Sequence, residues 1–144
     1  MQNKIRNGHC LCGGVQYQVT GNPIIVAHCH CDDCKRQSGA GHSTGAMYAV
    51  DNFTITGEVA EYKLTSAASN IVTKLFCPKC SSPILGKNSG AEGYVTVSLG
   101  TLDDTNDFKP EVVVFAENRN HWDLMDESIE SYNGQPDWKP NKDL

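Results

Sequence analysis

The sequence has no long apolar run. No segment approaches the roughly 18 consecutive apolar residues that a membrane helix needs. Residues 1–8 are polar and lack the apolar stretch of a signal peptide. These absences predict a soluble, cytoplasmic protein that does not enter a membrane. Because the cytoplasm is reducing, clustered cysteines there are more often metal ligands than disulfide partners.

Runs of basic residues are absent as well. The 144 residues include 12 Lys and Arg against 17 Asp and Glu, giving a formal net charge of −5 at pH 7. Nucleic-acid-binding domains usually carry a basic patch, so this charge argues against a nucleic-acid partner. The chain also lacks internal repeats, low-complexity stretches and linkers, and its length predicts a single domain over residues 1–144 of undetermined oligomeric state.

Helical periodicity is weak, and short strands account for most of the sequence. Val15, Tyr17 and Val19 alternate with glutamines, which is the period of a half-buried strand. Further strands are predicted at residues 24–27, 47–50, 53–56, 59–64, 71–76, 94–99 and 112–115. Short helices are predicted at residues 32–38 and 124–132, the second with Asp123 as its N-cap. With an irregular tail from residue 133, the pattern indicates a mainly β domain clamped by metal.

The seven cysteines fall into three tight clusters. These are Cys10-Leu11-Cys12, then Cys29, Cys31 and Cys34 within six residues, and finally Cys77-Pro78-Lys79-Cys80. An odd count fits a disulfide framework poorly. Four thiolates complete a tetrahedral zinc site, whereas three leave one position open, as in catalytic zinc sites. The count therefore predicts two Zn²⁺ sites, one closed and structural and one open and not always fully occupied.

The first and third clusters predict the structural site. A Cys-x-x-Cys turn directs two sulfurs at one ion, and Pro78 restricts the conformations of that turn. Joining the two pairs would close a long loop, which is where a clip stabilises a fold most. Two alternatives are four buried core cysteines and a redox-active Cys-x-x-Cys pair. The βαβ pattern that accompanies the redox motif is not apparent in the sequence.

Cys29, Cys31 and Cys34 predict the open site. A strand end followed by a turn can direct all three sulfurs at one ion. Water, substrate or a histidine would then take the fourth position. Three thiolates make zinc a weaker Lewis acid than three histidines do, and they suit a soft incoming ligand such as a substrate thiolate.

Histidines and cations flank these three cysteines. His28, His30 and His42 are candidates for a fourth ligand, for a hydrogen-bonding partner of a ligand or for a proton carrier. Each is equally compatible with simple packing or exposure to solvent. Lys35 and Arg36 can balance the thiolate charge or bind a substrate carboxylate, or they can form a solvated helix face.

Taken together, these motifs resemble those of the glutathione-dependent formaldehyde-activating enzyme family, which includes centromere-protein-V-like proteins. The similar segments are residues 8–17, 28–36, 76–80 and 100–104, followed by Trp122. The resemblance implies a β-tent fold of antiparallel sheets around a structural zinc. It implies that Cys10, Cys12, Cys77 and Cys80 bind that zinc. It also implies a catalytic zinc held by Cys29, Cys31 and Cys34.

The sequence departs from this family pattern at three places. Lys35 replaces a usual arginine, which weakens bidentate recognition of a carboxylate. Ser81 follows Cys80 where glycine is common, a difference that concerns turn geometry. Valines occupy residues 112–114, where the family has a histidine, so the substrate here can differ from glutathione.

The resemblance implies a carbon–sulfur lyase similar to S-(hydroxymethyl)glutathione synthase, which interconverts glutathione and formaldehyde with their adduct. A substrate thiol would take the open zinc position and attack a small aldehyde, with His30 or His42 carrying the proton. The expected catalytic residues are Cys29, Cys31, Cys34 and His30, with Lys35 and Arg36 binding substrate. Alternatives are a non-catalytic zinc module that binds another protein, and a redox or zinc-buffering protein.

Overall fold

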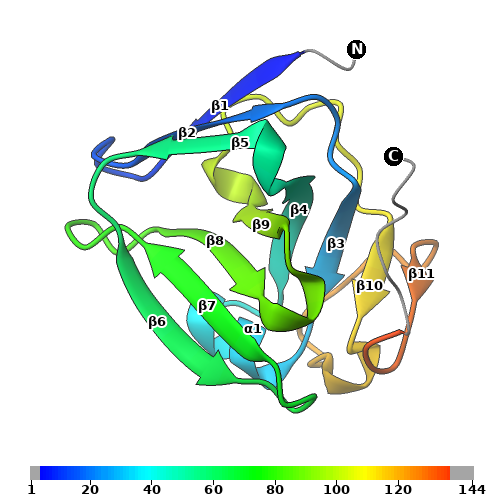
Figure 1. Ribbon diagram of the computed structural model, residues 1–144. Helices are drawn as coiled ribbons and strands as arrows, with labels where there is room; N and C mark the ends of the chain where they lie inside the picture. Colours follow the sequence, from blue (N-terminus) through cyan, green and yellow to red (C-terminus); the bar gives the residue numbers. More distant parts are fainter. Residues whose placement is uncertain (1–3, 137–144) are drawn as a thin grey trace.

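The computed structural model describes residues 4–136, which form two β-sheets with one short α-helix and four 3-10 helices (Figure 1). The strands are β1 (Ile5–His9), β2 (Gln16–Thr20), β3 (Ile25–Cys29), β4 (Ser43–Ala49), β5 (Phe53–Thr56), β6 (Ala60–Thr65), β7 (Ile71–Phe76), β8 (Pro83–Asn88), β9 (Tyr94–Ser98), β10 (Val112–Val114) and β11 (Glu130–Ser131). The helices are α1 (Asp32–Ser38), η1 (Val50–Asn52), η2 (Ser89–Ala91), η3 (Leu99–Thr101) and η4 (Ala116–Asn118). The mainly β fold class is confirmed.

The smaller sheet has the strand order β1-β2-β5, and the larger has the order β11-β10-β3-β4-β9-β8-β7-β6. In Figure 1 the small sheet lies above the larger one, and α1 lies at the lower side of the molecule. Most neighbouring strands are antiparallel, as expected. The exception is β10, which runs parallel to both β3 and β11, so the larger sheet is mixed.

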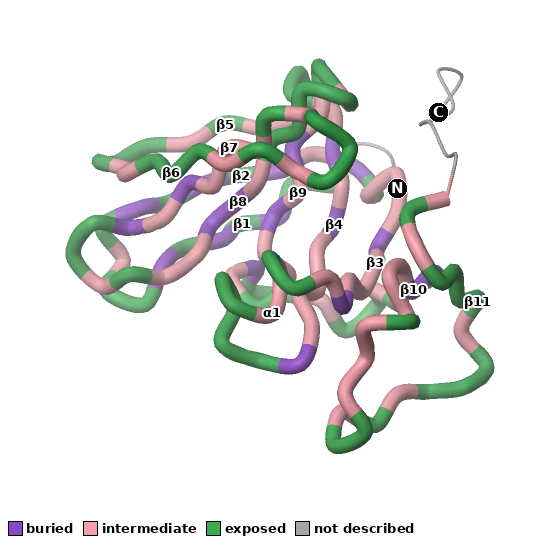
Figure 2. Tube along the Cα trace, turned by 90° about the horizontal axis from the view of Figure 1, so that it is seen from below, coloured by how far each residue is buried: buried purple, intermediate pink, exposed green. Residues whose placement is uncertain are grey.

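The core forms where the two sheets face each other. Along β2, Tyr17 and Val19 are buried while the intervening glutamines are exposed, which confirms the predicted alternation. They join one buried cluster with Val26 of β3 and Tyr48 of β4. Figure 2 shows buried segments of both strands in purple. Each fully buried aliphatic or aromatic side chain of this kind contributes about 1.5–3 kcal/mol. The face of β3 that carries Val26 therefore packs into the apolar core.

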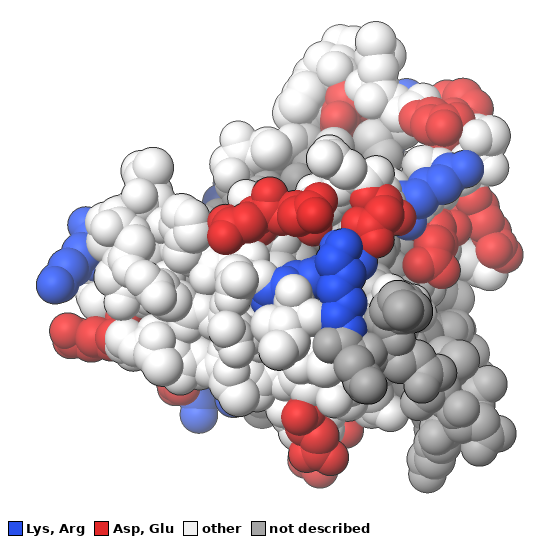
Figure 3. All heavy atoms as spheres, turned by 90° about the horizontal axis from the view of Figure 1, so that it is seen from above, with Lys and Arg blue, Asp and Glu red and all other residues white. Residues whose placement is uncertain are grey.

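A buried cation fastens β1 to the connection that precedes β10. Arg6 donates to both carboxylate oxygens of Asp107 at 2.9 and 2.6 Å, and its guanidinium lies 4.3 Å from the centre of the Phe108 ring. The Arg6 hydrogen bond lowers the pKa of Asp107 to about 2. On the upper face of the molecule, acidic groups lie next to a central group of basic ones (Figure 3).

Several predicted elements are confirmed and one is wrong. The strands at residues 53–56 and 71–76 and the helix at residues 32–38 have the predicted bounds, whereas β1, β8 and β11 were not predicted. Residues 124–132 form turns followed by β11 instead of a helix. Leu124 is 83% exposed, so it does not pack as a residue on the apolar face of a helix would. The Tyr132 amide donates to the Val113 carbonyl of β10, which holds this end of the segment beside the sheet.

Residues 133–136 are irregular, as predicted, and the remainder of the tail lies outside the described residues. Within residues 4–136, no helix is long and apolar enough to cross a membrane.

Candidate metal centres and the adjoining cavity

The cysteines of the first and third clusters come together at one point. The sulfurs of this outer cluster (Cys10, Cys12, Cys77 and Cys80) all lie within 4.8 Å of one another. The Cys12 sulfur is 3.6 Å from that of Cys10 and 3.7 Å from that of Cys77. Bonds of about 2.3 Å in a tetrahedral zinc site place sulfurs about 3.8 Å apart. The donor set and its spacing therefore fit a zinc ion.

Two tight turns from different sheets build the outer cluster. In the β1–β2 turn, the Val15 amide donates to the Cys10 sulfur at 3.3 Å; in the β7–β8 turn, the Lys79 amide donates to the Cys77 sulfur at 3.4 Å. Amide donors stabilise thiolates, the form that binds metal. Cys10 and Cys77 are each 1% exposed. An ion bound here would tie the small sheet to the large one.

Two serines complete the β7–β8 turn. Ser81 adopts φ 67°, the left-handed region that favours glycine, which accounts for the glycine usual at this position in the family that the sequence resembles. The Ser82 hydroxyl accepts from the Leu11 amide at 2.9 Å and lies 3.2 Å from the Cys80 sulfur. Hydrogen bonding from Ser82 lowers the pKa of Cys80 to about 5. The turn thus favours a thiolate.

The inner trio (Cys29, Cys31 and Cys34) is assembled by the end of β3 and the start of α1. Its three sulfurs lie within 4.8 Å of one another, and all three residues are half-buried. Cys31 caps α1, because its sulfur accepts from the Cys34 amide at 3.3 Å. Gly39, at φ 71°, ends the helix after two turns. This short helix holds two of the three sulfurs beside the strand end.

Contacts within the inner trio shift the pKa values of Cys29 and Cys34 in opposite directions. Contacts from Cys29 and then Cys31 lower the pKa of Cys34 to about 2, and the charge of Lys74 acts in the same direction. The contact with Cys31, followed by that with Cys34, raises the pKa of Cys29. Three sulfurs sharing negative charge are a suitable donor set for zinc.

A cavity of about 270 Å³ opens beside Cys29 and Cys34, on the side of the larger sheet that carries those sulfurs. Its wall is largely apolar, with Ile25, Met47 and Val72 among the lining side chains. Lys74 of β7 and Lys87 of β8 are its only charged lining residues in the described chain, and no carboxylate lines it. Neither lysine forms an ion pair within residues 4–136. The cavity thus suits a small molecule with a soft donor atom and a negative charge.

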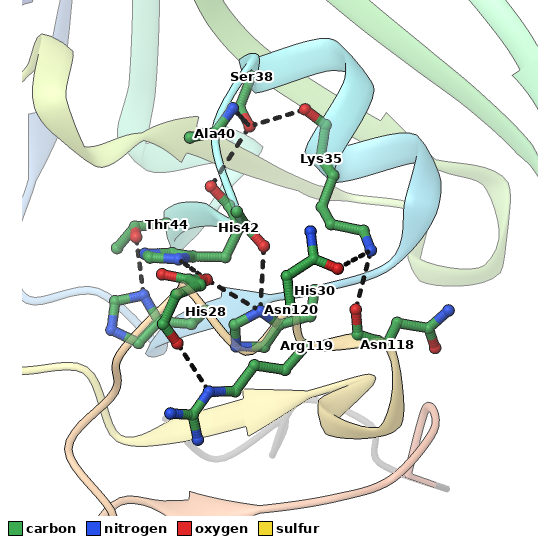
Figure 4. A network of polar contacts seen from close by, with 12 residues as sticks. His28, His30, Lys35, Ser38, Ala40, His42, Thr44, Asn118, Arg119 and Asn120 are labelled. Carbon is green, nitrogen blue, oxygen red and sulfur yellow. Dashed lines mark hydrogen bonds and ion pairs between the residues drawn. The ribbon is translucent and has the colours of Figure 1, made fainter.

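The cations predicted to bind substrate lie elsewhere. The Lys35 ammonium donates to the Asn118 carbonyl at 2.8 Å and lies 3.3 Å from a carboxylate oxygen of Asp32. Arg36 is exposed, and neither residue lines the cavity. Lys35 therefore ties α1 to η4 (Figure 4), while substrate binding by this pair stays a prediction. The sequence did not predict a role for Lys74 or Lys87, because each is a single polar residue in a strand and belongs to no motif.

Histidines gather on the opposite face of β3 from the cavity. Side chains alternate along a strand, so His28 points away from the side that carries Cys29. His28 Nδ1 lies 2.7 Å from the Thr44 hydroxyl, and burial, then His42, lower its pKa to about 4. His30 and His42 approach Asp123: its carboxylate oxygen lies 3.3 Å from His30 Nδ1 and 2.8 Å from His42 Nδ1. Neither histidine lines the cavity, and His30 as a catalytic residue stays a prediction.

Comparison with known proteins agrees with this arrangement. The family model described as glutathione-dependent formaldehyde-activating enzyme matches residues 5–118, which include all three cysteine clusters. The fold is similar to the crystal structure of a Rhodobacter sphaeroides protein at 17% identity, with a TM-score of 0.56, covering 69% of this chain and 90% of the other. Among curated proteins, none matches the chain.

Proposed function

The chain belongs to the glutathione-dependent formaldehyde-activating enzyme family, and on this premise we propose that it is a zinc-dependent carbon–sulfur lyase. Its substrate is the adduct of a small thiol, such as glutathione, with a small aldehyde, such as formaldehyde. The observation that supports this function best is the inner trio, three sulfurs that meet at the edge of a cavity. A trio of this kind leaves a position for a substrate atom.

In this proposal the two cysteine sets have separate roles. Cys10, Cys12, Cys77 and Cys80 hold a structural zinc, while Cys29, Cys31 and Cys34 hold a catalytic one. Zinc bound by the trio supplies positive charge that keeps a substrate thiol deprotonated near neutral pH. Lys35 supports the trio indirectly, because its contact with Asn118 fixes α1, which carries Cys34.

The cavity residues bind and orient the substrate. Lys74 and Lys87 attract its carboxylates as point charges, and the apolar wall excludes water from the reacting atoms. In the forward direction a carbon–sulfur bond forms, and the thiol proton ends on the aldehyde oxygen; the reverse direction breaks that bond. Neither oxidant nor reductant is needed. Ser43 lines the cavity together with Cys34, and its hydroxyl, which lowers the pKa of Cys34, is available to pass the proton.

Replacing Cys31 by alanine tests the proposal. Cys31→Ala removes one trio sulfur, and we expect turnover of S-(hydroxymethyl)glutathione to fall by about 100-fold or more. Elemental analysis should show that one zinc is lost while the outer cluster keeps its own. Ser38→Ala, at the exposed end of the same helix, is the matched control and should retain activity. Unchanged turnover of every thiol–aldehyde adduct by Cys31→Ala, with the outer zinc intact, would overturn the proposal.

A further inference from the structure

A carboxylate lies between two imidazoles on the face of β3 that is turned away from the cavity. His42 Nδ1 is 2.8 Å from Asp123 Oδ2, and His30 Nδ1 is 3.3 Å from the same oxygen (Figure 4). The Gly41 carbonyl oxygen lies 3.1 Å from His30 Nδ1. The two nitrogens and the carboxylate oxygen lie within 4.8 Å of one another. Three segments of the chain thus converge on one small volume.

The spacing of these atoms suits a metal ion. Bonds of about 2.0–2.2 Å to nitrogen and oxygen place neighbouring ligands about 3.3–3.6 Å apart around a tetrahedral ion, and about 2.8–3.1 Å apart at right angles. The separations of 3.3 and 2.8 Å lie close to these two values. Only small movements would be needed to admit an ion between the three groups.

The surrounding structure holds the carboxylate in place. A Cβ at Gly41 would lie 2.5 Å from Asp123 Cγ, so only glycine leaves room for this side chain. The Arg119 guanidinium donates to the Asp123 carbonyl at 2.7 Å and fixes the backbone. His30 is completely buried, and the Asp123 side chain is 11% exposed. Because His42 is 24% exposed, it provides a route for an ion from solvent.

We propose that His30, His42 and Asp123 form a third metal site that takes a divalent first-row transition ion, with Zn²⁺ as the probe. Two imidazoles and one carboxylate are a donor set for such ions, whereas calcium and magnesium prefer oxygen ligands alone. This site is separate from the inner trio: His30 follows the last residue of β3, and its ring lies beside His42, which also contacts His28 on the strand face opposite Cys29. It does not depend on the proposed lyase activity.

The site predicts a change of tautomer that can be measured. A carbonyl oxygen only accepts hydrogen bonds, so without an ion His30 carries a proton on Nδ1, facing Gly41. His30 makes its polar contacts through Nδ1, while Nε2 is buried and has no hydrogen-bond partner in residues 4–136. An ion bound at Nδ1 moves the ring proton to Nε2. The same shift is expected at His42.

The experiment begins with protein whose two cysteine sites are already filled with zinc. Further Zn²⁺ is added and followed by calorimetry and by nitrogen NMR of the histidine rings. We expect one additional equivalent to bind and the Nδ1 signals of His30 and His42 to shift. Asp123→Asn, which keeps the side-chain shape, should weaken this binding at least tenfold, as should His42→Ala. His121→Ala, an exposed histidine in the same segment, is the matched control and should bind like the parent.

Two results would overturn the third site. One is the absence of ring-nitrogen shifts and of an extra equivalent at millimolar Zn²⁺. The other is equal affinity in Asp123→Asn and His121→Ala. Either would show that the three side chains form only a hydrogen-bonded cluster. If His42→Ala unfolds, Asp123→Asn decides the question alone, with its fold checked by circular dichroism.

Discussion

The outer cluster and the inner trio use the same side chain in different surroundings. In the outer cluster, Cys10 and Cys77 are almost fully buried while Cys12 is exposed, and the two turns belong to different sheets. In the inner trio, all three cysteines are half-buried, and two of them border a cavity. Two buried ligands and a position that links the sheets favour stability, whereas sulfurs at the edge of a cavity favour chemistry. The difference lies in the surroundings and not in the ligand type.

The largest expected effect comes from breaking the outer cluster. Cys77→Ser removes a buried ligand that links the two sheets, and zinc binding at such sites is coupled directly to folding. We expect a fall in thermal midpoint of about 15 °C or more, measured by calorimetry, together with loss of one zinc. Cys31→Ser in the inner trio is the comparison and should lower the midpoint by only about 5 °C or less. Equal shifts in the two variants would contradict the division of roles.

A smaller effect is expected from changing the charge of the cavity. Lys74→Gln removes one of the two cations that face the inner trio. Since a hydrogen bond to a charged group contributes about 1.5–3 kcal/mol, we expect KM for a carboxylate-bearing thiol adduct to rise about tenfold. KM for a neutral thiol such as 2-mercaptoethanol should change less than twofold, because it has no carboxylate to bind.

The control for this variant is Lys63→Gln on β6, an exposed lysine that does not line the cavity. It should leave both KM values unchanged. If Lys74→Gln raised KM for acidic and neutral thiols alike, Lys74 would act on the inner trio itself and not on the substrate carboxylate.

The smallest expected effect concerns a hydrogen bond beside the outer cluster. Ser82→Ala removes the hydroxyl that accepts from Leu11 and contacts the Cys80 sulfur. We expect the thermal midpoint to fall by about 2–6 °C. The pKa of Cys80, about 5 with Ser82 present, should rise, so protons would compete with zinc and release it at a higher pH than in the parent. A zinc-release curve against pH measures this, and an unchanged curve would contradict it.

The cysteine clusters could be predicted from the sequence because each depends on short spacing. A turn of two to four residues is enough to bring its own sulfurs together, and the pairing of the first with the third cluster followed from the count of seven. Most strands were also predictable, because the alternation seen in Tyr17 and Val19 is a local pattern.

The remaining parts depend on contacts between distant segments. Asp123 has the short polar side chain of a helix cap, and only the fold reveals that it accepts from His42. Lys74 and Lys87 become neighbours of the inner trio because the larger sheet places β7 and β8 beside the cavity. In the sequence, the valines of β10 stand where the family has a histidine. The structure shows that Val113 is a buried strand residue, 3% exposed and paired with β3.

The parallel pairing of β10 with β3 also sets an order of assembly. Val26 and Glu111, which bond where these strands begin, are 85 residues apart. All four cysteines of the outer cluster have been synthesised by residue 80. The strand that carries Cys29 can pair fully with β10 only after residue 114 has been synthesised. Contacts between distant segments form late, and chains emerge from the N-terminus. The growing chain can therefore bring the outer cluster together first and complete the strand that carries Cys29 last.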